Sequence, residues 1–264
     1  MRTRLTAAAL TLAATAHAQR PAQGPMSTTP FVPEKAGYKM VWEDEFEGTQ
    51  LDPKKWEVRG IGPRGPAFVS ADAVKVKNGH LELWAMQQGD KMLSSAVGTQ
   101  GLFMPRYGYF ECRARLQKCA GVWGAFWIQS TEISKGEDPA IYGAEIDIME
   151  CFRKLGTDIV SHNVHWAYGP NQKSTRGMQS YLKGVGMGFH TFGLEWTPDK
   201  YIFYVDRMPF YEVTQGISHI PEYLILSMEY PNNPADLAPT VFPDVFTVDY
   251  VRVWQKPEQR QKAP

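Results

Sequence analysis

The feature that most constrains the fold is a succession of short runs rich in β-branched and aromatic residues, many with apolar and polar residues in alternation. Such runs are typical of β-strands, because successive side chains of a strand point to opposite faces of a sheet. Turn residues interrupt or end several of them, such as Asn78-Gly79, Pro198-Asp199-Lys200 and Asp206-Arg207. The runs cover residues 73–86, 107–117, 122–130, 144–152, 190–206, 223–230 and 246–255.

The sequence contains no amphipathic helical pattern three turns long and no internal repeat. Many short strands in one stretch predict an all-β sandwich or jelly roll, built largely of antiparallel sheets. The run at 144–152 lies in the middle of the chain, so we expect it to form a central strand.

The two ends of the chain differ in composition from the strand-rich part. The first 18 residues carry two arginines, an apolar run and Ala16-His17-Ala18, which is the pattern of a signal peptide. We therefore expect export, to the periplasm or out of the cell. The following Pro-, Ser- and Thr-rich stretch predicts a flexible linker. The expected segments are a signal peptide at 1–18, a linker at 19–35, one domain at 36–258 and a tail at 259–264.

Composition narrows the classes of partner. Lys plus Arg and Asp plus Glu each number 28, so the chain has no basic excess with which to bind nucleic acid or an anionic membrane. No apolar run is long enough to span a bilayer, and we expect a monomer. The three cysteines, Cys112, Cys119 and Cys151, lack the spacing of a zinc site, and their pairing stays open.

The stretch GAEIDIMECF, residues 143–152, places three carboxylates among apolar neighbours. In a regular strand Glu145 and Asp147 would share one face and Glu150 would oppose them. One extra residue, a β-bulge near Ile148 or Met149, would bring Glu150 back to the face of the other two.

Carboxylates gathered on a rigid strand of an aromatic-rich, exported β protein suit glycoside hydrolysis. One acid protonates the leaving oxygen, and a second carboxylate attacks the sugar or activates water; a separation of about 5–5.5 Å gives retention and about 6.5–9.5 Å gives inversion. Strand neighbours i and i+2 lie roughly 6.5–7 Å apart at Cα, which is compatible with the shorter range. The alternatives are a calcium or magnesium cage, a solvated strand face, or pairing with arginines such as Arg113, Arg115 and Arg153. Spacing alone leaves all of them open.

The hexapeptide EIDIME (145–150) resembles the E-x-D-x-x-E signature of glycoside hydrolase family 16, which includes laminarinases, lichenases, agarases, porphyranases and κ-carrageenases. The resemblance is wider than this motif and covers about residues 38–256. The blocks that carry it are VWEDEFEGTQLDPKKW (41–56), YGYFECRARLQ (107–117), GVWGAFWIQS (121–130), FHTFGLEWTPDKYIFYVD (189–206) and VFTVDYVRVWQ (245–255).

The resemblance implies a jelly-roll sandwich of two curved antiparallel sheets with a substrate cleft on the concave face. It also implies double displacement with retention and without a catalytic cofactor. Glu145 would be the nucleophile, Glu150 the general acid/base and Asp147 the assisting residue between them.

The same resemblance extends to binding residues. Trp123 and Trp127 lie four apart in one expected strand, where the family stacks sugar rings on tryptophan, although strand tryptophans also fill cores. His165, in HNVHWAYG, resembles the histidine that the family places beside the acid/base. Further candidates for substrate contacts are Trp166, Glu229 and Arg64, with His162 and Lys173 as weaker ones. Glu45 and Asp249, with the carbonyl of Gly79, occupy blocks where many members bind a structural calcium ion.

The sequence does not determine which polysaccharide is the substrate. The region 58–79 lacks the N-N-E-x-Q-Y-Y stretch of laminarinases, and Arg59 and Arg64 would suit a sulfated or acidic galactan. We expect an endo-acting retaining β-glycanase whose substrate is β-1,3- or mixed β-1,3/1,4-glucan. The alternatives are a β-galactan or an agar- or carrageenan-type polymer, a lectin that binds without cleavage, and a calcium-dependent adhesion module.

Overall fold

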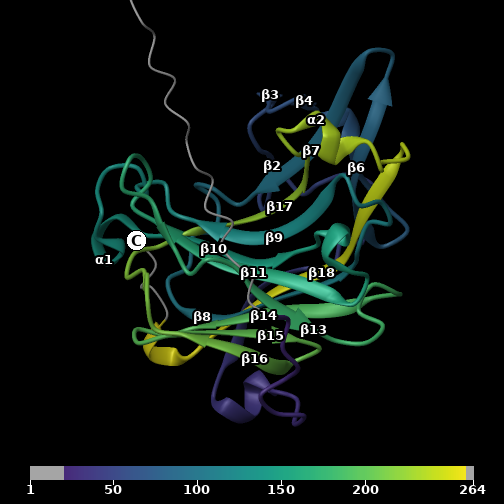
Figure 1. Cartoon of the computed structure of the whole chain (residues 1–264). Coiled ribbons are helices and arrows are strands. Elements are labelled where there is room, and N and C mark those ends of the chain that lie inside the picture. The colour runs from purple at the N-terminus through teal and green to yellow at the C-terminus, as the bar shows by residue number, and fades with distance from the viewer. Residues whose placement is uncertain (1–20, 260–264) are drawn as a thin grey trace, which may run out of the picture.

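The structure is a computed structural model that describes residues 21–259. It contains two sheets that face each other (Figure 1). The first sheet forms the concave layer of the sandwich and has seven neighbouring strands in the order β2 (Glu57–Val58), β7 (Lys91–Gly98), β17 (Tyr223–Glu229), β9 (Trp123–Gln129), β10 (Glu145–Glu150), β11 (Ile159–Trp166) and β13 (Met178–Tyr181), with β12 (Lys173–Ser174) also on β11.

The second sheet lies against the first one. Its order is β5 (Val74–Lys77), β6 (His80–Gln88), β18 (Asp244–Gln255), β8 (Gly108–Arg115), β14 (His190–Trp196), β15 (Tyr201–Val205) and β16 (Met208–Val213), with β1 (Lys39–Asp44) also on β18.

The β6–β7 hairpin connects the two sheets, and the short hairpin of β3 (Gly62–Arg64) and β4 (Ala67–Val69) lies at its edge. Every strand pairing is antiparallel except β4 beside β7. The helices are single turns, α1 (Pro139–Tyr142) and α2 (Pro234–Leu237), together with four short 3₁₀ turns, Pro33–Ala36, Ala71–Ala73, Arg153–Leu155 and Pro257–Gln259. The expected antiparallel sandwich is therefore confirmed, and β10 is a central strand as expected.

Alternation along the strands fills the space between the sheets. In β6, Leu81, Leu83 and Ala85 are fully buried, while the residues between them are partly exposed. The turn that precedes β6 needs a left-handed backbone at two successive residues, which Asn78 (φ 53°) and Gly79 (φ 69°) provide. The core is therefore built by the period-two pattern that the sequence shows.

The segment expected to be a flexible linker is packed against the domain from residue 21 onward. The Phe31 ring lies 4.9 Å from the ring of Tyr109 and 5.2 Å from that of Tyr204. Gln23 forms a backbone bridge to Ser180. The half-buried Phe31 ring and these backbone contacts hold the segment against the domain, where the composition predicted a flexible linker. The predicted signal peptide (1–18) and residues 260–264 of the tail lie outside the described residues.

Within residues 21–259, no helix is long and apolar enough to cross a membrane.

Candidate active site

The EIDIME motif (145–150) forms β10, and this strand contains the β-bulge considered in the sequence analysis. Asp147 is opposite Asn163 of β11, but the next registered pair is Glu150 with Ser161, so two residues of β10 face the single residue His162. On the other side, β9 pairs with Asp147 and Met149 and skips Ile148. The extra residue is therefore Ile148, as the prediction of a bulge near Ile148 or Met149 required.

The bulge sorts the side chains of β10 into two groups. Ile146, Ile148 and Met149 are fully buried in the core between the sheets. The carboxylates of β10 instead line a pocket on the open face of the first sheet, together with residues of β3, β9 and β17; its lining is Arg64, Trp123, Ala125, Trp127, Glu145, Asp147, Glu150 and Glu229.

Two neutral donors hold the Glu145 carboxylate. The Gln129 amide donates to Oε2 of Glu145 over 2.8 Å, and the Tyr168 hydroxyl donates to the same oxygen over 2.5 Å. The Gln129 amide is itself fixed, because its oxygen accepts from Arg59 (2.9 Å) and from the Tyr223 hydroxyl (2.9 Å). Burial, and next the charge of Glu145, raise the pKa of Tyr168, so the hydroxyl keeps the proton that it donates.

The Glu150 carboxyl lies at the other end of the pocket, where the Trp123 indole N–H donates to its Oε1 over 3.0 Å. Burial, and next the charge of Asp147, raise the pKa of Glu150 well above its ordinary value. Burial also raises the pKa of Asp147, followed by the charges of Glu145 and Glu229. A carboxyl of raised pKa keeps its proton near neutral pH and can donate it.

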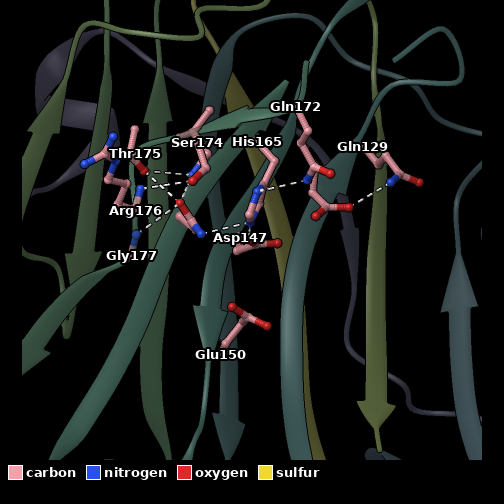
Figure 2. A network of polar contacts seen from close by, with 12 residues as sticks. Gln129, Asp147, Glu150, His165, Gln172, Ser174, Thr175, Arg176 and Gly177 are labelled. Carbon is pink, nitrogen blue, oxygen red and sulfur yellow. Dashed lines mark hydrogen bonds and ion pairs between the residues drawn. The ribbon is translucent and has the colours of Figure 1, made fainter. Parts of the chain in front are cut away.

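His165 lies beside Asp147 (Figure 2), and the side-chain amide of Asn163 also contacts it. Its Nε2 is 3.4 Å from Oδ2 of Asp147 and 2.8 Å from Nδ2 of Asn163. Oδ1 of Asn163 accepts from the Thr175 hydroxyl and from the backbone N–H groups of Val164 and Gly177. These donors fix which way the Asn163 amide points, so its NH₂ group faces His165. Nε2 of His165 accepts from this NH₂ group, while its Nδ1 lies 3.4 Å from the Gln172 amide nitrogen.

The structure also places the other residues that the sequence singled out. Arg64 forms a two-pronged ion pair with Glu229 across the pocket, at 2.7 and 2.9 Å. Trp127 is buried, its indole N–H donates to Ser227, and the guanidinium of Arg59 lies 5.3 Å from its ring centre. Trp166 packs against the main core and is absent from the described lining of this pocket.

The residues expected to bind calcium do not fit that ion. The Glu45 carboxylate forms a two-pronged ion pair with Arg252 at 2.7 and 3.0 Å. Asp249 lies 2.5 Å from Arg113 and 3.6 Å from His80, and Gly79 adds only a backbone turn. Carboxylates already neutralised by guanidinium groups are poor ligands for a hard cation. The geometry therefore favours two surface ion pairs over the calcium site.

One set of side chains within residues 21–259 has metal-ligand geometry, namely Glu145, Asp147 and His165, whose nearest ligand atoms lie within 4.8 Å of one another. The Nε2 atom of His165 already accepts from Asn163, and Oε2 of Glu145 already has two donors. The set is therefore organised by hydrogen bonds.

A buried acid, Glu222, supports the start of β10. Its Oε1 accepts from the backbone N–H of Ala144 over 2.8 Å, while its Oε2 has no partner among residues 21–259. Gly143 makes the approach possible, because a Cβ there would lie 2.6 Å from Oε1 of Glu222 and the residue has φ 76°. Burial raises the pKa of Glu222 to about 8.

This shift predicts a stability that falls as pH rises. Between the unfolded value near 4.5 and about 8, the unfolded chain loses the Glu222 proton and the folded chain keeps it. The free energy of unfolding should then fall by up to about 1.4 kcal/mol per pH unit in that window. In Glu222→Gln this loss should disappear, which thermal melts at pH 5.5 and 8 would measure against the surface variant Glu43→Gln. An unchanged pH dependence in Glu222→Gln would contradict the assignment.

Comparison with known proteins decides the family. The model of the GH16 domain of β-porphyranases A–D matches residues 40–256. The chain belongs to glycoside hydrolase family 16. It is therefore a glycoside hydrolase, and the jelly-roll expectation is confirmed.

Individual members of family 16 resemble the chain over most of its length. The β-glucanase of Rhodothermus marinus is 29% identical over 245 residues, which cover 83% of this chain and 85% of that protein. Glucan endo-1,3-β-glucosidase A1 of Niallia circulans is 28% identical over 271 residues, covering 86% of this chain but only 39% of the longer relative. The solved laminarinase of Flavobacterium sp. UMI-01 superposes with a TM-score of 0.67 and 29% identity, over 82% of this chain and all of that chain (100%).

Sequence reasoning missed several residues of the site. Gln129 follows Trp123 and Trp127 at even spacing on β9, so the period-two rule that grouped the tryptophans would also have found it. Tyr168 and Asn163 carry no comparable signal. The first comes from a loop, and the second acts only through the side chain of its neighbour His165.

Proposed function

We propose that this family 16 enzyme is a retaining endo-β-glycanase in which Glu145 is the nucleophile and Glu150 the acid/base. In the first step Glu150 donates its proton to the glycosidic oxygen as Glu145 bonds to the anomeric carbon, and the leaving chain departs. In the second step Glu150 takes a proton from water, which attacks the anomeric carbon and frees the Glu145 carboxylate. The two steps use no cofactor.

The observation that carries the proposal is the bulge, which puts Glu145, Asp147 and Glu150 on one pocket wall. The two ends of the wall suit opposite roles. Gln129 and Tyr168 occupy Oε2 of Glu145, so the bond to carbon forms from Oε1. Glu150 has the raised pKa of an acid, and Asp147 between them has a raised pKa as well. Asp147 lies between the two glutamates, where it can separate the pKa values of the outer two.

The Tyr168 hydroxyl gives a test of how the nucleophile is held. We expect Tyr168→Phe to lower kcat by about 10- to 100-fold, because a hydrogen bond to a charged group contributes about 1.5–3 kcal/mol. The melting temperature should change little, since the ring remains. A kcat within threefold of the wild type would show that Tyr168 does not orient Glu145; Tyr181→Phe, on an exposed tyrosine, is the matched control.

The substrate that the relatives favour is β-1,3- or mixed β-1,3/1,4-glucan, because the β-glucanase and the laminarinase named above are similar over the full domain. The pocket offers what a neutral sugar chain needs, namely the tryptophans of β9 beside the acids.

A sulfated or acidic β-galactan is the second candidate. The matching family model describes porphyranases, and Arg64 lies in the pocket with a guanidinium fork that suits sulfate. This fork is engaged by Glu229, so a sulfate group would have to compete with that carboxylate. Arg59 lies over the rings of Trp127 and Tyr223 and is a second cation near the pocket, although it is not part of the pocket lining.

The experiment is reducing-end release from laminarin, mixed-linkage glucan, agarose, porphyran, desulfated porphyran, carrageenan and a neutral galactan. Each polymer is run beside the Glu145→Gln protein. Release from a glucan that the variant lacks supports the first candidate, and release from porphyran but not from its desulfated form supports the second. Retained binding to a polymer with no release from any would overturn the hydrolase in favour of a lectin.

We further infer export from the signal-peptide pattern of residues 1–18, with a monomeric enzyme outside the cytoplasm. N-terminal sequencing of the protein recovered from periplasm or medium would test this inference, with Gln19 as the expected first residue.

A further inference from the structure

The bulge in β10 leaves one backbone carbonyl outside the sheet ladders. Ile148 has no registered partner in β9 or in β11, and its side chain is fully buried. A buried carbonyl without a hydrogen bond costs about 1–3 kcal/mol. A bulge at this position therefore requires a donor from a side chain.

His162 supplies that donor from the residue directly opposite the bulge. Its Nδ1 lies 2.6 Å from the carbonyl oxygen of Ile148, and its Nε2 lies 2.7 Å from the hydroxyl of Ser180 on β13. The imidazole is fully buried, with the ring of Phe203 5.1 Å from its centre. Because a carbonyl only accepts, Nδ1 carries the proton and Nε2 accepts from Ser180.

This neutral form matches the surroundings of the ring. Burial lowers the pKa of His162 to about 4, so the ring stays neutral throughout the range in which a glycosidase works. His162 is thus a fixed donor, unlike His165, which lies three residues further along the same strand and 3.4 Å from Asp147.

We propose that His162 is a positioning residue for the acid/base: by capturing the Ile148 carbonyl it locks the bulge that turns Glu150 into the pocket. This inference rests on the proposed role of Glu150. Without the lock, β10 can relax toward a regular strand, in which the side chain after Met149 points to the opposite face. Glu145 and Asp147 lie before the bulge, so their direction is set independently.

Two substitutions separate the bulge bond from the rest of the histidine. In His162→Asn the side-chain amide reaches the place of Nδ1 and can still donate to Ile148, but it cannot reach Ser180. In His162→Gln the longer amide reaches the place of Nε2, so it keeps the contact with Ser180 and loses the one with Ile148. Both variants lose the ring and its packing, so both should melt at similarly lowered temperatures.

The test measures kcat on two substrates: the polymer that the wild type cleaves best, and the 2,4-dinitrophenyl glycoside of its disaccharide, whose leaving group needs no proton. For His162→Gln we expect polymer turnover to fall about 100-fold, the size of a misplaced acid, while the first-step burst on the dinitrophenyl glycoside falls less than about threefold. For His162→Asn we expect both rates within about fivefold of the wild type.

Equal losses in the two variants, or losses of equal size on both substrates, would overturn the lock. If His162→Gln does not fold, nitrogen NMR of the wild type decides instead. An Nδ1–H tautomer at pH 6 agrees with the lock, and an Nε2–H tautomer overturns it. Failure of the proposed function is separate, because it would appear as an inactive wild type or as an active Glu150→Gln.

Discussion

Glu145→Gln is expected to abolish hydrolysis of the polymer, with kcat lowered on the order of 10⁴-fold or more. The amide is nearly the same size as the carboxylate and can still contact Gln129 and Tyr168, but it cannot form the covalent bond to the anomeric carbon. The fold should be kept, because β10 is held by its ladders and its core residues.

Reducing-end release and a thermal melt, each compared with the surface variant Glu43→Gln, would measure these two expectations. The smaller variant Glu145→Ala adds a stereochemical test. Azide entering the vacated space should give a glycosyl azide with inverted configuration, because only one displacement then occurs. Near-normal turnover by Glu145→Gln would remove Glu145 from the role of nucleophile.

Glu150→Gln is the second large effect, and it should depend on the leaving group. On the polymer we expect a loss of about 10²- to 10⁴-fold, since the glycosidic oxygen receives no proton. On a dinitrophenyl glycoside the first step should proceed, and the glycosyl-enzyme should accumulate because no base activates water. A burst of dinitrophenol followed by slow turnover is the expected trace.

Mass spectrometry of the protein after the burst would locate the sugar on the peptide that contains Glu145. With Glu150→Ala, azide should restore turnover and yield a glycosyl azide of retained configuration, the opposite of the product from Glu145→Ala. Equal losses on polymer and dinitrophenyl glycoside would exclude Glu150 as the acid.

The pH profile is tied to the same residue. Because burial and the charge of Asp147 raise the pKa of Glu150, the enzyme should stay active above the ordinary range of a glutamic acid and lose activity as that proton dissociates. The alkaline limb of kcat/KM should therefore move or vanish in Glu150→Gln, whose residual activity has no such acid.

The sequence predicted the fold and the central strand well because both depend on local alternation. Period-two geometry within one strand showed that Glu150 shares a face with Glu145 and Asp147 only if β10 contains a bulge near Ile148 or Met149, and the family resemblance implied that the three acids act together. His165 lies opposite Glu145 because β11 follows β10 in the chain and pairs with it in antiparallel orientation.

Contacts between distant segments could not be predicted in the same way. Arg64 meets Glu229 across 165 positions of the chain, and Tyr168 reaches the nucleophile from a loop that carries no periodic signal. Trp123 lines the pocket and Trp166 packs against the main core, and a strand pattern does not encode that difference. The ion pairs of Arg113 with Asp249 and of Arg252 with Glu45 could not be predicted either, because the partners come from distant positions in the chain or from different strands.

The placement of both acids on the short strand β10 has a consequence for how the polysaccharide specificity of such an enzyme can change. Both reacting carboxyl groups come from six consecutive residues, so their spacing is a property of one strand and its immediate neighbours. A segment beside the pocket, such as the β3–β4 hairpin that carries Arg64, can be lengthened, recharged or exchanged without moving the two acids relative to each other, whereas the loop after β11 must keep Tyr168 as a donor to Glu145. Loop grafting from other glycanases onto this chain should therefore redirect polymer choice while the stereochemical outcome stays the same.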